Sequence, residues 1–74
     1  MELKRGGDRL AVKLIELMGS SEKSWDDAVE EAVAKASNSV RNIHGVDVLG
    51  FKAKIENGKI VQYRADVKIA FVLE

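Results

Sequence analysis

The sequence predicts an α+β fold in which one helix packs on a three-stranded antiparallel sheet. Three observations predict it: an apolar run, then a helical repeat of apolar residues, then two more apolar runs joined by an Asn-Gly dipeptide typical of tight hairpins. These four segments are 10–18, about 24–43, 46–56 and 59–73. The chain order is therefore strand, helix, strand, strand.

The composition excludes several classes of protein. Twelve Lys and Arg residues balance twelve Asp and Glu residues, so we expect no nucleic-acid partner bound through bulk positive charge. No apolar run approaches the ~18 residues of a membrane span, and we expect no membrane partner. There is no cysteine, and His44 is the single histidine; disulfides, thiolate sites and two-histidine metal sites are thus excluded.

Length bears on domain organisation and assembly. The 74 residues allow one domain, which we place at 10–74. Residues 1–9 have mixed charge and no periodicity, and are predicted to form a flexible N-terminal extension. They lack a signal-peptide core, so the expected location is the cytoplasm. Since so small a core has neither disulfides nor a structural metal, we expect a homo-oligomer.

The first strand and the helix have recognisable boundaries. Residues 10–18 are apolar except for two charged positions, and the Gly-Ser-Ser that follows at 19–21 is expected to end the strand. Ser24 and Asp27 have the spacing of a capping box at a helix start. Gly45 is expected to adopt the left-handed conformation after the last turn. The apolar positions at helical spacing are Trp25, Val29, Ala32, Val33, Ala36, Val40 and Ile43.

The hairpin strands differ in their regularity. Apolar residues alternate cleanly through 59–73, as in a strand with one buried face. In the 46–56 run the apolar phase changes at Leu49-Gly50, which predicts a β-bulge there. Gly58 is expected to be left-handed.

The turn is predicted from the register. A two-residue turn over 57–58 would set Phe51 opposite Arg64, whereas a three-residue loop over 56–58 sets Phe51 opposite Tyr63. Because the second register places both apolar sets on one face, we predict the three-residue loop.

The topology follows from the connections. The helix crossover makes the first two strands parallel, and the third lies antiparallel between them in the order 1-3-2. The helix is expected to cover the odd-numbered face of the third strand. The opposite face is polar, and is either solvated or lines an assembly cavity; its residues are Lys52, Lys54, Gln62, Arg64, Asp66 and Lys68.

Two ordered motifs resemble the dodecin family. The opening motif is VKLIELMGSSEKSWDDA at 12–28, and the closing motif combines NGKIVQY at 57–63 with FVLE at 71–74. The resemblance covers about residues 11–74. It implies protomers that assemble into a hollow homododecamer, which binds a flavin such as riboflavin or FMN for storage and not for turnover.

The residues that contact flavin in this family differ here. The resemblance places a stacking Trp shortly after the helix, where this chain has Gly45, and a Gln after the last-strand Tyr, where it has Arg64. The chain is thus similar to members that lack the flavin-stacking Trp. Gly45, Asp47 and Arg64 are the ligand-pocket positions that the resemblance implies, with flavin weak or absent. No metal ligands are predicted.

Two functions remain open. The first is an assembly that binds and stores a small ligand of the flavin class. The second is a flavin-free shell of identical subunits that binds a cation such as calcium, or another ligand. No enzyme is predicted, because no serine has a histidine placed by the sequence to activate it and no phosphate loop follows Gly6-Gly7.

Individual side chains also allow two interpretations. Arg64 either holds a phosphate or carboxylate group or pairs with Asp66 or Asp47 across an interface. Trp25 and Tyr63 either stack on a ligand or, as we expect, serve as packing residues. The acidic residues at the helix start either bind a hard cation or, as we expect, provide capping and solubility.

Overall fold

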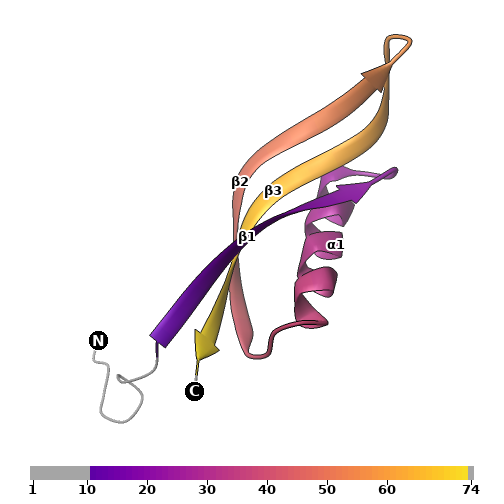
Figure 1. The fold of residues 1–74 in the computed structure, drawn as a ribbon. Helices are drawn as coiled ribbons and strands as arrows, with labels where there is room; N and C mark the ends of the chain where they lie inside the picture. The colour runs from indigo at the N-terminus through magenta and orange to yellow at the C-terminus, as the bar shows by residue number, and fades with distance from the viewer. Residues whose placement is uncertain (1–10, 74) are drawn as a thin grey trace.

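A computed structural model describes residues 11–73 and confirms the predicted β-α-β-β order (Figure 1). The sheet order is β1-β3-β2, with β3 antiparallel to both neighbours. The extension predicted at 1–9 lies outside the described residues. The elements are β1 (Ala11–Ser21), α1 (Trp25–Ser37), β2 (Ile43–Glu56) and β3 (Lys59–Leu73).

Strand β1 is longer than predicted, because Gly19 does not end it. Gly19 pairs with Ala65 and the strand continues to Ser21. A side chain at Gly19 would overlap the Ala28 carbonyl oxygen and lie 2.9 Å from the Ala32 nitrogen. This glycine therefore lets α1 approach the strand closely, and its role is in packing.

The start of α1 confirms the predicted cap. Ser24 is the N-cap, and its hydroxyl oxygen accepts a hydrogen bond of 3.0 Å from the Asp27 backbone N–H. The Asp27 carboxylate does not return to Ser24. It accepts a 2.7 Å bond from the buried Ser21 hydroxyl, whose oxygen accepts one of 2.8 Å from the Lys23 N–H. The end of β1 is thereby tied to the first helical turn.

The predicted helix end at residue 43 is wrong, since α1 stops at Ser37. The Ser37 hydroxyl donates to the Val33 carbonyl at 2.9 Å, an example of a short polar side chain competing for backbone groups. Asn42, with φ 61°, takes the left-handed position that was expected of Gly45. Ile43 still packs against the core, which explains why the apolar helical spacing continued beyond the helix.

The hairpin has the two-residue turn, so the predicted three-residue loop is wrong. Glu56 pairs with Lys59, and the turn residues Asn57 and Gly58 both have positive φ, at 53° and 75°. This is the geometry of a type I′ turn. The expected left-handed Gly58 is confirmed.

A bulge next to the turn gives the apolar register for which the three-residue loop was predicted. The pairing shifts by one residue between Lys54 and Ile55, so that Ala53 lies opposite Tyr63 and Phe51 opposite Ala65. At Phe51 and Ala53, odd residues of β2 therefore face odd residues of β3 as predicted, although the partner of Phe51 differs. The bulge predicted at Leu49 is confirmed by a second shift between Val48 and Gly50.

The core lies between α1 and the odd face of β3, as predicted. The helix contributes small residues, which allows the close approach at Gly19. Val67 and Ile69 are the largest side chains that are fully buried. The core residues are Ala28, Ala32, Ala36, Ala65, Val67, Ile69 and Phe71.

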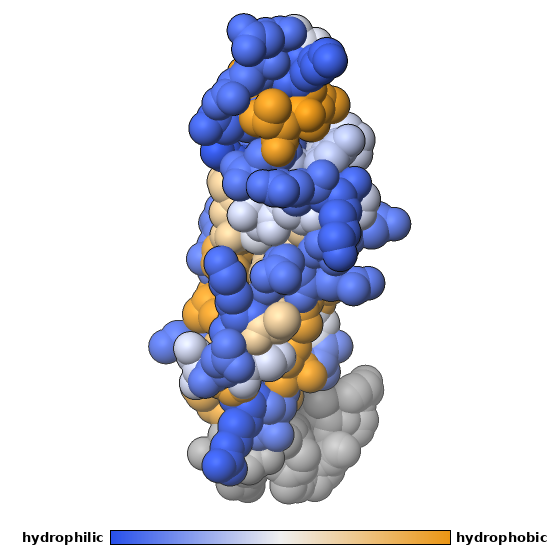
Figure 2. Space-filling model, turned by 90° about the vertical axis from the view of Figure 1, so that its right-hand side faces the viewer, coloured by the Kyte–Doolittle hydropathy of each residue, from blue (hydrophilic) through white to orange (hydrophobic). Residues whose placement is uncertain are grey.

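The subunit is elongated, and α1 covers only part of the sheet (Figure 1). Its extents are 56 × 23 × 14 Å and its radius of gyration is 15.4 Å, against about 11 Å for a compact chain of this length. Within residues 11–73, twelve large apolar side chains are exposed. Among them are Ile55 and Ile60 near the turn, at the end where Figure 2 shows an apolar patch.

Candidate functional site

One face of the sheet is left uncovered by the elements of residues 11–73. Figure 1 shows α1 on one side of the sheet. That side carries Val67 and Ile69, and the opposite side, called here the bare face, carries the even-numbered residues of β3. The register arranges this face in rows across the strands. From the hairpin end, the rows are Ser20–Arg64–Lys52, Met18–Asp66–Gly50, Glu16–Lys68–Asp47 and Leu14–Ala70–Gly45.

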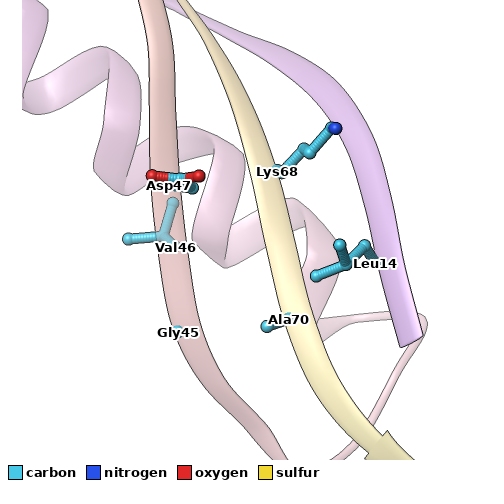
Figure 3. Close-up of a pocket in the computed structure, with 6 residues that line it drawn as sticks. All are labelled: Leu14, Gly45, Val46, Asp47, Lys68 and Ala70. Atoms are coloured by element: carbon cyan, nitrogen blue, oxygen red, sulfur yellow. The ribbon is translucent and has the colours of Figure 1, made fainter. Parts of the chain in front are cut away.

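A shallow concavity of about 270 Å³ lies at the last two of these rows (Figure 3). All three strands contribute to it, and its floor is built from small or apolar residues. Its charged groups are Asp47 and Lys68, which are cross-strand partners. The lining residues are Leu14, Gly45, Val46, Asp47, Lys68 and Ala70.

The depth of the concavity depends on Gly45 and Ala70, which are paired across β2 and β3. A Cβ atom at Gly45 would lie 3.7 Å from the Ala70 Cβ, an ordinary van der Waals contact. Among the described glycines, positive φ occurs at Gly58 and not at Gly45. The backbone therefore permits a side chain at position 45, and the absence of one opens the floor.

The structure brings together two of the three predicted pocket positions. Gly45 and Asp47 line the concavity, whereas Arg64 does not. Arg64 lies on the same face, six residues along β3 from Ala70, which corresponds to about 20 Å. Its guanidinium Nε donates a 2.8 Å hydrogen bond to the Gln62 side-chain oxygen. Within one subunit Arg64 is thus separate from the concavity.

Sequence reasoning did not assign Leu14 and Ala70 to the site. The feature that places them in the site is the pairing of β1 with β3, which sets Leu14 opposite Ala70. Lys68 was predicted on the polar face but not as part of a pocket. If the register of β1 against β3 had been predicted from the sequence, it would have indicated Leu14, Lys68 and Ala70.

The aromatic residues lie on the other side of the sheet. Trp25 packs edge-on against Tyr63, with ring centroids 4.9 Å apart, and lies 6.0 Å from Phe51. The Trp25 indole N–H donates a 2.9 Å bond to the Lys52 carbonyl oxygen. These contacts join the helix start to the hairpin, in agreement with the packing role expected of Trp25 and Tyr63.

The acidic residues at the start of α1 interact with groups close to them in the chain. The Asp27 carboxylate binds Ser21, and Asp26 lies exposed in the first turn, where negative charge is favourable. Within residues 11–73, no three His, Asp or Glu side chains are grouped so that they could hold a metal ion. In the same range, α1 and its 13 residues are too short to cross a membrane.

Comparison with known proteins identifies related sequences. The family model named Dodecin matches residues 11–74. The calcium dodecin of Mycobacterium tuberculosis is 30% identical over 59 residues, which cover 80% of this chain and 83% of that protein. The dodecin of Thermus thermophilus is 27% identical over 62 residues, which cover 84% and 90%.

Solved structures share the fold. The dodecin from Streptomyces coelicolor superimposes with a TM-score of 0.85 at 29% identity, and the match covers 88% of this chain and 93% of the other. The Mycobacterium tuberculosis calcium dodecin, described as calcium chelating and as having a novel calcium-binding site, gives a TM-score of 0.76 at 32% identity. That match covers 86% of this chain and 91% of the other. The β-α-β-β arrangement is therefore the one that these proteins adopt.

Proposed function

The chain belongs to the dodecin family, and from this premise we propose that it is a homododecameric protein that binds and stores a small ligand on the bare face of its sheet. No catalysis is part of the proposal, and the cytoplasmic location stays a prediction from the sequence. The observation that carries the proposal is the concavity at Gly45 and Asp47, two of the positions where the family resemblance places a ligand.

Assembly is supported by the shape of the subunit. An isolated chain of this length is compact, whereas this one is extended and exposes apolar side chains along the hairpin. Contacts between copies would remove that apolar surface from water. Light scattering should give a mass near twelve times 8.1 kDa. A monomer or dimer at micromolar concentration would contradict the proposed assembly.

The ligand is expected to be bound without a stacking ring. Stacking on an aromatic side chain contributes ~1–3 kcal/mol, so its absence at Gly45 weakens flavin binding about 5- to 150-fold. Arg64 also replaces an amide, which donates and accepts hydrogen bonds, with a group that only donates. We therefore expect riboflavin affinity no better than micromolar, and a purified protein that is colourless or weakly loaded with flavin.

Riboflavin fluorescence quenching tests this assignment. Gly45→Trp combined with Arg64→Gln should raise the affinity at least fivefold, because the backbone at Gly45 accepts a side chain. Gly50→Trp is the matched control, since it adds an indole to the same strand in open space but away from the concavity. An equal gain in both proteins would show that the added indole acts without the site. Tight stoichiometric quenching by the unmodified chain would instead assign binding to another aromatic residue.

Calcium binding is a second candidate, favoured by the 30% identity to a calcium dodecin. A site within one subunit is not supported, because residues 11–73 group no three carboxylates around a point. A calcium site would therefore combine carboxylates from several copies. Calorimetric titration of the assembled protein with CaCl₂ after chelator treatment tests it; saturable heat that is absent with MgCl₂ would support this candidate over the first.

A further inference from the structure

The chain has three asparagines, and the structure leaves all of them exposed. They are Asn38, Asn42 and Asn57. Asparagine is a thermolabile residue, because the backbone nitrogen of the next residue can attack its side-chain carbonyl carbon and displace the amide. Exposure does not distinguish the three positions. They differ in the residue that follows each of them and in the hydrogen bonds of that residue's backbone nitrogen.

The residue that follows decides how easily its nitrogen can approach the side chain. Asn57 precedes Gly58, which has no side chain to hinder the attack. A Cβ atom built at Gly58 would meet nothing within 4 Å, so the space around this residue is open. Asn42 precedes Ile43, whose β-branched side chain is stiff and packs against the core. The approach is therefore open at Asn57 and hindered at Asn42.

The hydrogen bonds of the following nitrogen separate Asn57 from Asn38. Asn38 precedes Ser39, whose N–H donates a 3.0 Å bond to the Ala36 carbonyl oxygen. In a two-residue hairpin turn, the closing bond joins the residues that flank the turn, and the N–H of the second turn residue is left free. Within residues 11–73, no acceptor is bonded to the Gly58 N–H. The nitrogen that would attack Asn57 is thus available.

The turn can also change its conformation at little cost. Asn57 is held at a φ of 53°, and its side chain must move before it can meet the next nitrogen. Figure 1 shows the turn at the tip of the β2–β3 hairpin, which projects beyond α1. Every residue from 54 to 61 is exposed. Local opening of such a segment breaks few buried contacts, and it occurs far more often than global unfolding.

We propose that Asn57 is a site of spontaneous deamidation in the folded protein. The Gly58 nitrogen bonds to the Asn57 Cγ atom and the Cγ–Nδ2 bond breaks. The proton of the Gly58 N–H leaves with the side-chain nitrogen as ammonia, and a succinimide ring remains. Solvent water then adds to either ring carbonyl carbon and breaks the bond from that carbon to nitrogen. Addition at Cγ gives aspartate, and addition at the backbone carbonyl carbon gives isoaspartate.

The two products affect the hairpin differently. Each adds one negative charge at the tip, but isoaspartate also inserts the Asn57 Cβ atom into the main chain. A two-residue turn has no room for an additional backbone atom between its flanking partners. Because the turn lies beside the bulge after Lys54, isoaspartate should loosen the hairpin end, where Ile55 and Ile60 are exposed. This modification is independent of the ligand that the protein binds.

Incubation of the assembled protein in water enriched in heavy oxygen, followed by proteolysis and mass spectrometry, tests the site. The peptide with Asn57 should lose ammonia and gain one heavy oxygen, with isoaspartate in excess over aspartate. It should react at least about tenfold faster than Asn38 and Asn42, which corresponds to a barrier lower by about 1.4 kcal/mol. These two asparagines are controls within the same folded chain. Equal rates at all three, or reaction at Asn57 in urea alone, would overturn the proposal.

A second measurement separates the added charge from the added backbone atom. Asn57→Asp carries the charge from the start and keeps an Asp-Gly pair that suits the same turn, so its melting temperature should stay close to that of the unmodified protein. Aged protein should melt at a lower temperature than Asn57→Asp. Treatment with an enzyme that methylates isoaspartyl carboxylates, and so returns them to aspartate, should reverse this loss. Equal melting of aged protein and Asn57→Asp would contradict the loosening of the hairpin.

Discussion

The two faces of the sheet differ in what holds their residues in place. On the covered face, α1 packs so closely that Gly19 has no room for a side chain, and Val67 and Ile69 are fully buried. On the bare face, Arg64, Asp66 and Lys68 stand in rows and are only partly buried. The first face is shaped by packing within the subunit. The second gains little stability from its charges, which leaves them free to serve a ligand or another copy.

The largest effect should come from the closest helix–sheet contact. Gly19→Ala places a Cβ atom against the Ala28 carbonyl and the Ala32 nitrogen, both backbone atoms that cannot rotate away. We expect a loss of about 3 kcal/mol or more in the free energy of unfolding, measured by urea denaturation at fixed protomer concentration. Gly50→Ala, where the added Cβ meets nothing within 4 Å, should change it by less than about 1 kcal/mol. Similar values for the two variants would contradict the packing role of Gly19.

Substitutions at two neighbouring residues of β3 allow a direct comparison of how much each face contributes to stability. Val67→Ala removes methyl groups from a fully buried side chain and should cost about 1–3 kcal/mol. Lys68→Ala, on the bare face, should change the free energy of unfolding by no more than about 0.5 kcal/mol. Thermal melts of both variants test the difference, and an unchanged melting temperature for Val67→Ala would place that face outside the core.

The turn and the bulge beside it together decide which residues occupy each face, because they set the register of β2 against β3. Gly58 has a φ of 75°, and a β-branched residue there is strained. Gly58→Val should therefore cost more than about 1 kcal/mol. The control is Gly50→Val, at a position without positive φ and with open space around it. Equal melting temperatures for Gly58→Val and the unmodified protein would contradict the prediction that a side chain is strained at position 58.

The smallest effect is expected from charges on the bare face. Lys54 and Glu56 lie 3.5 Å apart, with about half of each side chain exposed. Lys54→Gln should change the free energy of unfolding by less than about 0.5 kcal/mol. Urea denaturation of the assembled protein tests this. A loss above about 1 kcal/mol would contradict the prediction and would indicate that Lys54 is buried between copies.

Part of the candidate site could be predicted from the sequence and part could not. The family resemblance supplied Gly45 and Asp47, and the structure places both at the concavity. The resemblance also supplied Arg64, which lies outside it. Leu14 and Ala70 come together through the pairing of β1 with β3, which joins residues that lie far apart in the chain. No local pattern sets such a register.

The sequence by itself determined the element order, the cap at Ser24, the bulge at Leu49 and the buried odd face of β3. Each of these depends on residues that are close in the chain, through capping bonds or side-chain alternation. Tertiary structure alone decided that α1 ends at Ser37 and that β1 passes through Gly19. Beyond Ser37 the apolar residues pack against the core without being helical, and Gly19 makes room for α1. Local propensity does not predict such contacts between elements. The hairpin required both, since Asn-Gly fixed a two-residue turn and the bulge after Lys54 then returned the apolar residues to one face.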